Sequence, residues 1–160
     1  MFVNGESLGR ATTEENRAVF EMSYCPGELT AVSCDGGKEI SRDTIRSGSA
    51  AAGLRIRAEK EKLSANGEEL CFAVVEVVDA DGNLVPYAEN ELTAEVSGAA
   101  RLLAFGSARP KTEENYVSGS VKAYKGRALA VLRAGAEVGT ATLTLRSEGL
   151  GEKSLTMSIG

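Results

Sequence analysis

Apolar and polar residues alternate one by one along much of this chain. Cys71, Ala73, Val75 and Val77 would all lie on one face of an extended strand, with Glu76 on the other face, because successive strand side chains point to opposite sides of a sheet. The alternation recurs in four further stretches, at residues 54–58, 92–96, 141–145 and 155–159. No stretch shows a long helical period. The pattern predicts strands that bury one face in a core and leave the other in water. We expect Glu76 to lie on the solvent face.

Turn sequences separate these stretches at frequent intervals. They are Asn4-Gly5, Pro26-Gly27, Asp35-Gly36-Gly37, Asn66-Gly67 and Asp81-Gly82-Asn83. Glycine and asparagine supply the positive φ angles that tight reversals require. Many short strands with turns between them predict an all-β fold of antiparallel, immunoglobulin-like β-sandwich modules.

A run of small residues at 48–53 predicts a linker or a short extended crossover, because none of its side chains is large enough to anchor a core. Residues 54–160 then contain about seven strand candidates, as a complete immunoglobulin-like sandwich requires. Residues 1–47 contain only about four, fewer than such a sandwich needs. We therefore expect an incomplete first module, with its exposed sheet edge at the hairpin around Asn4-Gly5. Such an edge could pair with a second copy to give a homodimer.

Composition excludes several classes of function. The chain has no histidine and no tryptophan, and its net charge is −5. Without histidine there is no histidine-based triad or metal ligand, and no G-x-S-x-G nucleophile motif is present. The negative charge opposes binding to nucleic acid or to anionic membranes, and no apolar run approaches the ~20 residues that cross a bilayer. We expect no catalysis by this chain, no cofactor and no metal.

The three cysteines, Cys25, Cys34 and Cys71, show no metal-binding or disulfide spacing. Cys71 lies in an apolar run, where a reduced thiol packs as a small hydrophobe. A bridge between Cys25 and Cys34 across a hairpin is the alternative. Three free thiols favour a cytoplasmic protein, with a secreted or periplasmic parent protein as the other possibility.

Acidic motifs are the remaining candidates for chemistry. Residues 79–83 lack the glycine and glutamate positions of an EF-hand, so a turn at Asp81-Gly82 is the better interpretation. The doublets Glu14-Glu15, Glu68-Glu69 and Glu113-Glu114 cannot form a facing catalytic pair, since neighbours on a strand point apart. We interpret each doublet as solvated surface.

One long connection, residues 106–116, mixes basic, acidic and aromatic side chains. Loops of this kind often contact another surface. Arg109, Lys111, Glu113 and Tyr116 are therefore the candidate partner-contacting residues. The alternative is a solvated loop packed by its own Tyr116.

Five segments resemble, in order, the C-terminal region of family 2 glycoside hydrolases of the bacterial β-galactosidase and β-glucuronidase type. Residues 2–9 are similar to its F-V-N-G-x-S-L-G hairpin, and residues 24–32 to its Y-x-P-G-x-L-x-A-V turn and strand. Residues 43–46 are similar to its inter-module joint. Residues 77–86 and 126–131 resemble its last, bacterial immunoglobulin-like module.

The resemblance implies a string of β-sandwich modules that follow a (β/α)8 catalytic barrel. The two catalytic glutamates lie in that barrel, so the resemblance assigns no catalytic residue here. It implies a non-catalytic C-terminal fragment with a structural, docking or cleft-shaping role, whose partners are the barrel and the upstream domains. The alternatives are a stand-alone carbohydrate-binding module and an invasin-like spacer of a cell-surface protein.

Overall fold

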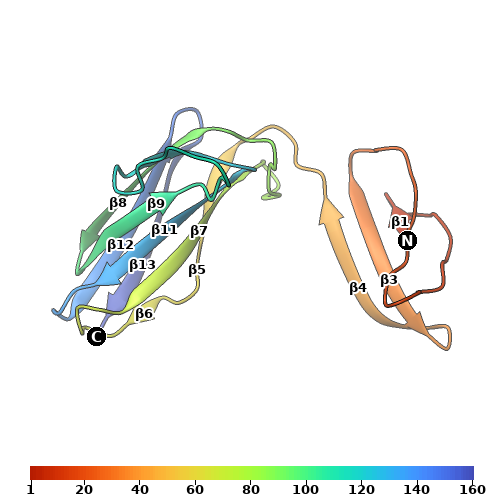
Figure 1. Cartoon of the computed structure of the whole chain (residues 1–160), viewed down its shortest axis with the longest axis horizontal. Helices are drawn as coiled ribbons and strands as arrows, with labels where there is room; N and C mark the ends of the chain where they lie inside the picture. Colours follow the sequence, from red (N-terminus) through yellow and green to blue (C-terminus); the bar gives the residue numbers. More distant parts are fainter. The chain divides into compact units, whose positions relative to one another are not determined.

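The computed structural model describes residues 1–160, all of them in strands, turns and loops (Figure 1). They form two compact units, Met1–Ser47 (unit 1) and Gly48–Gly160 (unit 2). The structure contains no helix suited to crossing a membrane.

Unit 1 is a four-stranded antiparallel sheet in the order β2-β1-β3-β4. Its strands are β1 (Phe2–Val3), β2 (Glu6–Ser7), β3 (Glu28–Asp35) and β4 (Lys38–Arg46). The predicted turn at Asn4-Gly5 is present, and both residues have positive φ angles, 50° and 84°. The Asn4 side chain also accepts a hydrogen bond from the Glu28 backbone N–H (2.8 Å), which fixes the turn to the start of β3.

Unit 1 has almost no core. Thr30 is its one buried residue, while Ile45 is 63% exposed and Tyr24 is 82% exposed. The hairpin at Asn4-Gly5 lies at one edge of the sheet, as expected, because its second strand β2 pairs only with β1. The sheet has a second and longer edge at the nine residues of β4, which pair only with β3.

Unit 2 is a sandwich of two sheets, as the alternation predicted. One sheet has the order β10-β8-β12-β13-β6 and the other β5-β7-β11-β9. The strands of the first sheet are β6 (Lys62–Leu63), β8 (Glu91–Gly98), β10 (Ser120–Lys122), β12 (Gly139–Ser147) and β13 (Gly151–Ile159). Those of the second are β5 (Gly53–Ala58), β7 (Leu70–Val78), β9 (Ala100–Gly106) and β11 (Arg127–Ala134).

Two details of this topology differ from the expected antiparallel sandwich of about seven strands. The short strands β6 and β10 were not foreseen, because two or three residues are too few for an alternation to be visible. In addition, β6 pairs with β13 in parallel, at Lys62 with Ser158 and at Leu63 with Ile159. All other strand pairs are antiparallel.

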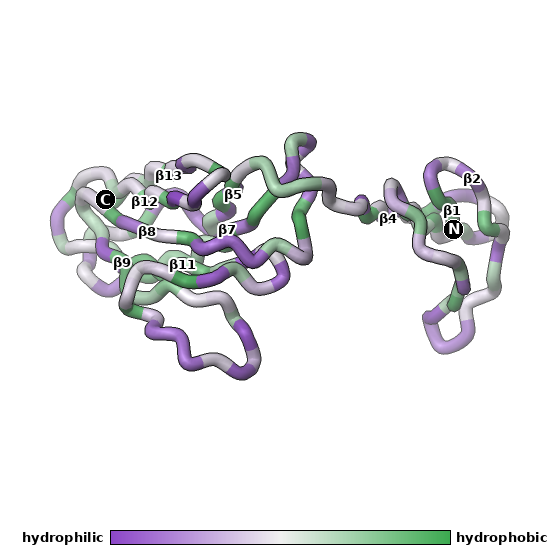
Figure 2. The backbone as a smooth tube through the Cα atoms, turned by 90° about the horizontal axis from the view of Figure 1, so that it is seen from above, coloured by the Kyte–Doolittle hydropathy of each residue, from purple (hydrophilic) through white to green (hydrophobic).

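The core of unit 2 lies between the two sheets. Cys71, Ala73, Val75 and Val77 of β7 are all 0% exposed, so the predicted inner face is confirmed. From the opposite sheet, Leu143 and the other alternate residues of β12 are equally buried. Along the tube in Figure 2, the strands of unit 2 carry most of the hydrophobic residues, whereas the loop beside β9 and β11 is largely hydrophilic.

The small residues at 48–52 are hydrogen-bonded to unit 2, which fits a short extended crossover better than a free linker. The Ser49 backbone N–H donates to the Asp79 carboxylate (3.0 Å), and the Ala52 N–H donates to the Val78 carbonyl (2.8 Å). A side chain at Gly48 would lie 2.4 Å from the Leu84 carbonyl oxygen, so this position requires glycine. The small side chains of this segment let its backbone pack closely against the rest of unit 2. Gly53, the last residue of the run, is the first residue of β5.

All three cysteines are free, and Cys25 and Cys34 are too far apart to form a bridge within the chain. Cys25 lies beside Asn4 at the start of β3, whereas Cys34 is near the end of that strand. Six residues of extended strand span about 20 Å, against the ~7 Å between Cα atoms that a disulfide allows. Cys71 is buried, and desolvation raises the pKa of its thiol.

We predict that Val75→Asp unfolds unit 2, because it places an unpaired charge between the two sheets. The loss should exceed ~4 kcal/mol. The control is Val138→Asp at a position that is 80% exposed, which should change the free energy of unfolding by less than ~0.5 kcal/mol. Denaturant unfolding followed by circular dichroism measures both. Similar losses in the two variants would contradict the assignment of the inner face.

Candidate functional site

The loop between β9 and β10, residues 107–119, is held to the sandwich at both of its ends. The Phe105 N–H donates to the Tyr116 carbonyl (2.7 Å). Ser107 is 2% exposed, and both its backbone N–H and its hydroxyl donate to the Glu114 carboxylate. Because a buried hydroxyl and amide need acceptors, Glu114 fixes the path of the loop.

Arg109 points toward the body of unit 2. Its guanidinium lies 5.3 Å from the centre of the Tyr124 ring, within the range of a cation–π contact. It also lies 3.8 Å from the Glu89 carboxylate, and its Nε is buried without a hydrogen-bond partner. Of the four candidate residues, Arg109 thus serves at least partly as an anchor of the loop.

Lys111 and Glu113 form the exposed tip of the loop. Neither side chain has a hydrogen bond or ion pair within the chain, and with Arg109 and Thr112 they line a shallow hollow. Tyr116 is 46% exposed, at the base of the loop. The structure therefore leaves Lys111, Glu113 and Tyr116 accessible, and their contact with a partner stays a prediction.

Gly106 determines where the Tyr116 ring lies. A Cβ atom at this position would be 2.6 Å from Cδ1 of Tyr116, closer than atoms can approach. The ring therefore occupies the space that a side chain of residue 106 would fill. Gly106 pairs with Leu129 of β11, so the ring lies on the outer side of the four-stranded sheet.

Glu14 and Glu15 are both exposed, as expected, whereas the other two carboxylate doublets are only partly solvated. In these two doublets Glu68 and Glu113 are exposed. Their neighbours bind within the chain: Glu114 holds Ser107, and Glu69 accepts hydrogen bonds from Lys60 (2.6 Å) and from the Ser64 N–H (2.6 Å). The Lys60 ammonium, followed by the Ser64 N–H, lowers the pKa of Glu69 to about 2.

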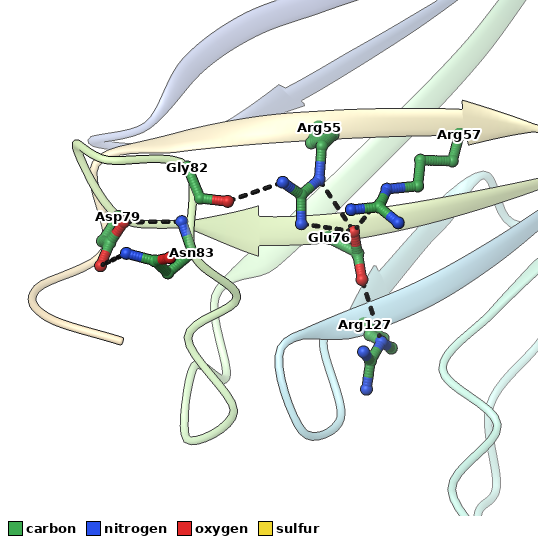
Figure 3. A network of polar contacts seen from close by, with 7 residues as sticks. All are labelled: Arg55, Arg57, Glu76, Asp79, Gly82, Asn83 and Arg127. Atoms are coloured by element: carbon green, nitrogen blue, oxygen red, sulfur yellow. Dashed lines mark hydrogen bonds and ion pairs between the residues drawn. The ribbon is translucent and has the colours of Figure 1, made fainter. Parts of the chain in front are cut away.

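Glu76 is not solvated, contrary to the expectation from sequence. It lies on the outer face of β7, but it is only 4% exposed because arginines cover it from both neighbouring strands (Figure 3). Arg55 of β5 and Arg127 of β11 pair with Glu76 in register, and Arg57 reaches it from the next outward position of β5. The signal was present in the sequence: a lone acid in an apolar strand, and arginines at alternate positions 55 and 57.

The contacts of Glu76 are close and numerous. Arg55 approaches it at 2.8 Å, Arg127 at 3.2 Å and Arg57 at 3.3 Å. Burial raises the pKa of the Glu76 carboxyl, but the hydrogen bonds and charges of the arginines outweigh that effect and leave the pKa below its usual value. Glu76 is therefore ionised at neutral pH and binds the neighbouring strands β5 and β11 to β7.

Asp79 organises the turn that follows β7. Its carboxylate accepts hydrogen bonds from the N–H groups of Ser49, Asp81 and Asn83. Figure 3 shows the contact of Asp79 with Asn83. Gly82 in this turn has a φ of +80°. The Ser49 N–H is the largest cause of a pKa lowered to about 2. The predicted turn at Asp81-Gly82 is present, and Asp79 serves it as a structural acceptor.

The described residues provide no arrangement for hydrolysis or metal binding. No group of three or more acidic or cysteine side chains lies close enough to hold a metal ion. The buried carboxylates Glu76 and Asp79 and the partly buried Glu114 all accept hydrogen bonds from arginine, backbone or hydroxyl donors. What the site offers is a fixed loop with a charged tip and one exposed aromatic ring.

Comparison with known proteins identifies relatives for both units. Residues 54–156 match the family described as Glycoside hydrolase family 2 C-terminal domain 5, and residues 1–41 match a domain of unknown function (DUF4982). A β-galactosidase from Bacteroides ovatus is 31% identical over 160 residues, which are 99% of this chain and 19% of that protein.

Solved structures give the same picture. A glycosyl hydrolase family 2 member from Bacteroides cellulosilyticus is 31% identical, with a TM-score of 0.92, over 99% of this chain and 21% of its own. A β-glycosidase from Bacteroides vulgatus is 28% identical, with a TM-score of 0.93, over 98% of this chain and 20% of its own. The chain thus spans about one fifth of the length of these relatives.

We predict that Glu114→Ala destabilises unit 2 by about 1–3 kcal/mol, because the buried N–H and hydroxyl of Ser107 lose their acceptor. The neighbouring Glu113→Ala is the matched control and should change stability by less than ~0.5 kcal/mol. Urea unfolding compares the two. If both variants behave alike, Glu114 does not hold the loop.

We further predict that Glu76→Gln lowers the stability of unit 2 by about 2–4 kcal/mol at pH 7, since it leaves three arginines around a neutral side chain. The control is Glu61→Gln at an exposed position.

The effect of Glu76 should also depend on pH. Because the pKa of Glu76 is lowered on folding, its contribution to the stability of unit 2 is present above the ordinary carboxyl pKa of 4.5 and is lost as the pH falls below that value. Denaturant unfolding between pH 7 and pH 3 should show the difference between wild type and Glu76→Gln shrinking; a constant difference would refute the assignment.

Proposed function

Because the chain belongs to the Glycoside hydrolase family 2 C-terminal domain 5 family, we propose that it is an accessory region of a larger glycosidase of the β-galactosidase type. The resemblance stated from the sequence is confirmed by this match. The observation that carries the proposal is the coverage: relatives align with 99% of this chain, yet the alignment takes in only about a fifth of their own length.

The role of the region is non-catalytic. The chain matches only the C-terminal domain of the relatives, and the catalytic barrel is not part of it. The β-galactosidase type is supported by the named relatives from Bacteroides ovatus and Thermoanaerobacter pseudethanolicus, at 31% and 29% identity. A family 2 β-glucuronidase shares the fold, with a TM-score of 0.84 at 23% identity.

The role that the structure supports best is docking against the rest of the enzyme. Unit 2 has a complete core and presents a loop that is rigid at its base and charged at its tip. In this proposal Lys111, Glu113 and Tyr116 contact the barrel or an upstream domain, and Arg109 holds the loop in place. In unit 1 the free edge of the nine-residue strand β4 could accept a further strand, from the same enzyme or from a second copy.

Two other functions are less well supported. A stand-alone carbohydrate-binding module usually offers an aromatic platform, and this chain has no tryptophan and only 5% aromatic residues. An invasin-like spacer would share the fold, but family membership favours the glycosidase.

We predict that the isolated chain hydrolyses neither a nitrophenyl galactoside nor a nitrophenyl glucuronide, while the larger glycosidase does hydrolyse its substrate. Deleting residues 48–160 from that enzyme should lower its temperature of inactivation, because a docked domain stabilises the state to which it binds. Calorimetric titration of the isolated chain with galacto-oligosaccharides is the control for glycan binding. An enzyme whose stability, assembly and kinetics are all unchanged by the deletion would refute the docking role.

A further inference from the structure

The outer side of the four-stranded sheet of unit 2 is apolar at its centre. Alternate residues of β7 and β11 that turn away from the core include Phe72, Val74, Leu129 and Val131, which we call the outer apolar face. Phe72 pairs with Val131 and Val74 with Leu129, so the four side chains are neighbours on one surface. Phe72 is 40% exposed and the other three are partly exposed.

The other sheet of unit 2 shows what a solvated outer side looks like in this same molecule. On β12 and β13, the outward positions are hydroxyl residues that hydrogen-bond across the strands, such as Thr142 with Thr156 and Thr144 with Ser154. A strand that is apolar on both faces, as β7 is over residues 70–75, is typical of a sheet that is covered on both sides. The four-stranded sheet is covered on only one side within unit 2.

Tyr116 extends this surface. Its ring lies on Gly106, and Gly106 is the register partner of Leu129. The ring therefore continues the outer apolar face toward the loop, and it is 46% exposed. An aromatic ring at such a place is the side chain that interfaces use most often as an anchor.

Arginines border the outer apolar face at two sides. At one end Arg101 and Arg133 are register partners on β9 and β11. At the other end Glu76 is surrounded by Arg55, Arg57 and Arg127.

Two of these arginines, Arg57 and Arg127, contact Glu76 through Nε, and their terminal nitrogens have no partner within the chain. Glu59 is a further acid beside Phe72, but the border is positive on a chain whose net charge is −5.

We propose that the outer apolar face, with Tyr116 and the arginine border, is the surface by which unit 2 docks onto another domain of the same glycosidase polypeptide, an inference that rests on the proposed function. The partner surface is apolar at its centre and carries carboxylates that bind the free guanidinium nitrogens. Two copies packed face to face would place arginine against arginine, which opposes a symmetric dimer here. The relatives have about four-fifths of their length outside the matched region, which supplies such a domain.

Hydroxyl-radical footprinting tests this surface directly. Phe72 is 40% exposed in the isolated chain, and burial in an interface should lower its oxidation roughly fivefold in the intact glycosidase, with a similar decrease at Tyr116. Arg101→Glu in the intact enzyme should restore oxidation at both residues, because it reverses a border charge that has no partner within the chain. The matched control is Thr156→Glu on the outer side of the other sheet, which should leave the protection unchanged.

The outcomes separate this inference from the proposed function. Equal oxidation of Phe72 in the isolated chain and in the intact enzyme would overturn the docking surface, even where deletion of residues 48–160 still lowers the stability of the enzyme. If Phe72 becomes protected from oxidation in the isolated chain as the concentration rises, the partner is a second copy and not another domain of the enzyme.

If Arg101→Glu and Thr156→Glu restore the oxidation of Phe72 to the same extent, the arginine border does not contribute to docking. Unfolding midpoints of the variant chains, unchanged from wild type, verify that each variant folds.

Discussion

The dry contact between the inner faces of two sheets is the constraint on which unit 2 depends. A sheet that alternates apolar and polar residues is stable only where its apolar face is removed from water, which contributes roughly 25 cal/mol for each Å² buried. In unit 2, β7 and β11 meet this requirement against β8 and β12, and each inner residue of β7 from Cys71 to Val77 is fully buried. Unit 1 has a regular sheet but no second layer, so its strands are held by hydrogen bonds, turns and surface ion pairs such as that of Arg46 with Glu28.

Features that follow from local pattern could be predicted from the sequence. The alternation of apolar and polar residues at 71–77 and 141–145 correctly predicts which strand faces are buried. The turns predicted at Asn4-Gly5 and Asp81-Gly82 are also present. Features that depend on partners distant in sequence could not. The burial of Glu76 requires Arg127, 51 residues away, and the role of Glu114 depends on a hydroxyl that is buried only in the folded loop. The parallel pairing of β6 leaves no trace in its two residues.

The candidate site illustrates the same division. The charged and aromatic character of four residues in one loop predicts partner contacts, and three of these residues are accessible. The structure turns Arg109 inward onto Tyr124, a contact between residues that the sequence gives no reason to associate. The structure also places Tyr116 beside an apolar surface on β7 and β11. The sequence of the loop does not indicate this surface, because the Tyr116 ring reaches it only through the pairing of Gly106 with Leu129. For an accessory domain, the surface that matters is thus assembled from strands as much as from loops.

The pairing of β6 with β13 has a consequence for synthesis. The Ser158 hydroxyl bonds to the Glu61 carbonyl across 97 residues of sequence, and β13 lies inside its sheet, with Met157 and Ile159 buried. While the ribosome still holds residues of β13, the five-stranded sheet lacks β13 and the pairing of β6, so the layer that faces β5 and β7 is incomplete. Unit 2 therefore reaches its native state only after Ile159 has left the exit tunnel. Contacts of such sequence separation form slowly, so the nascent chain exposes its apolar strands throughout translation and is then most prone to aggregate.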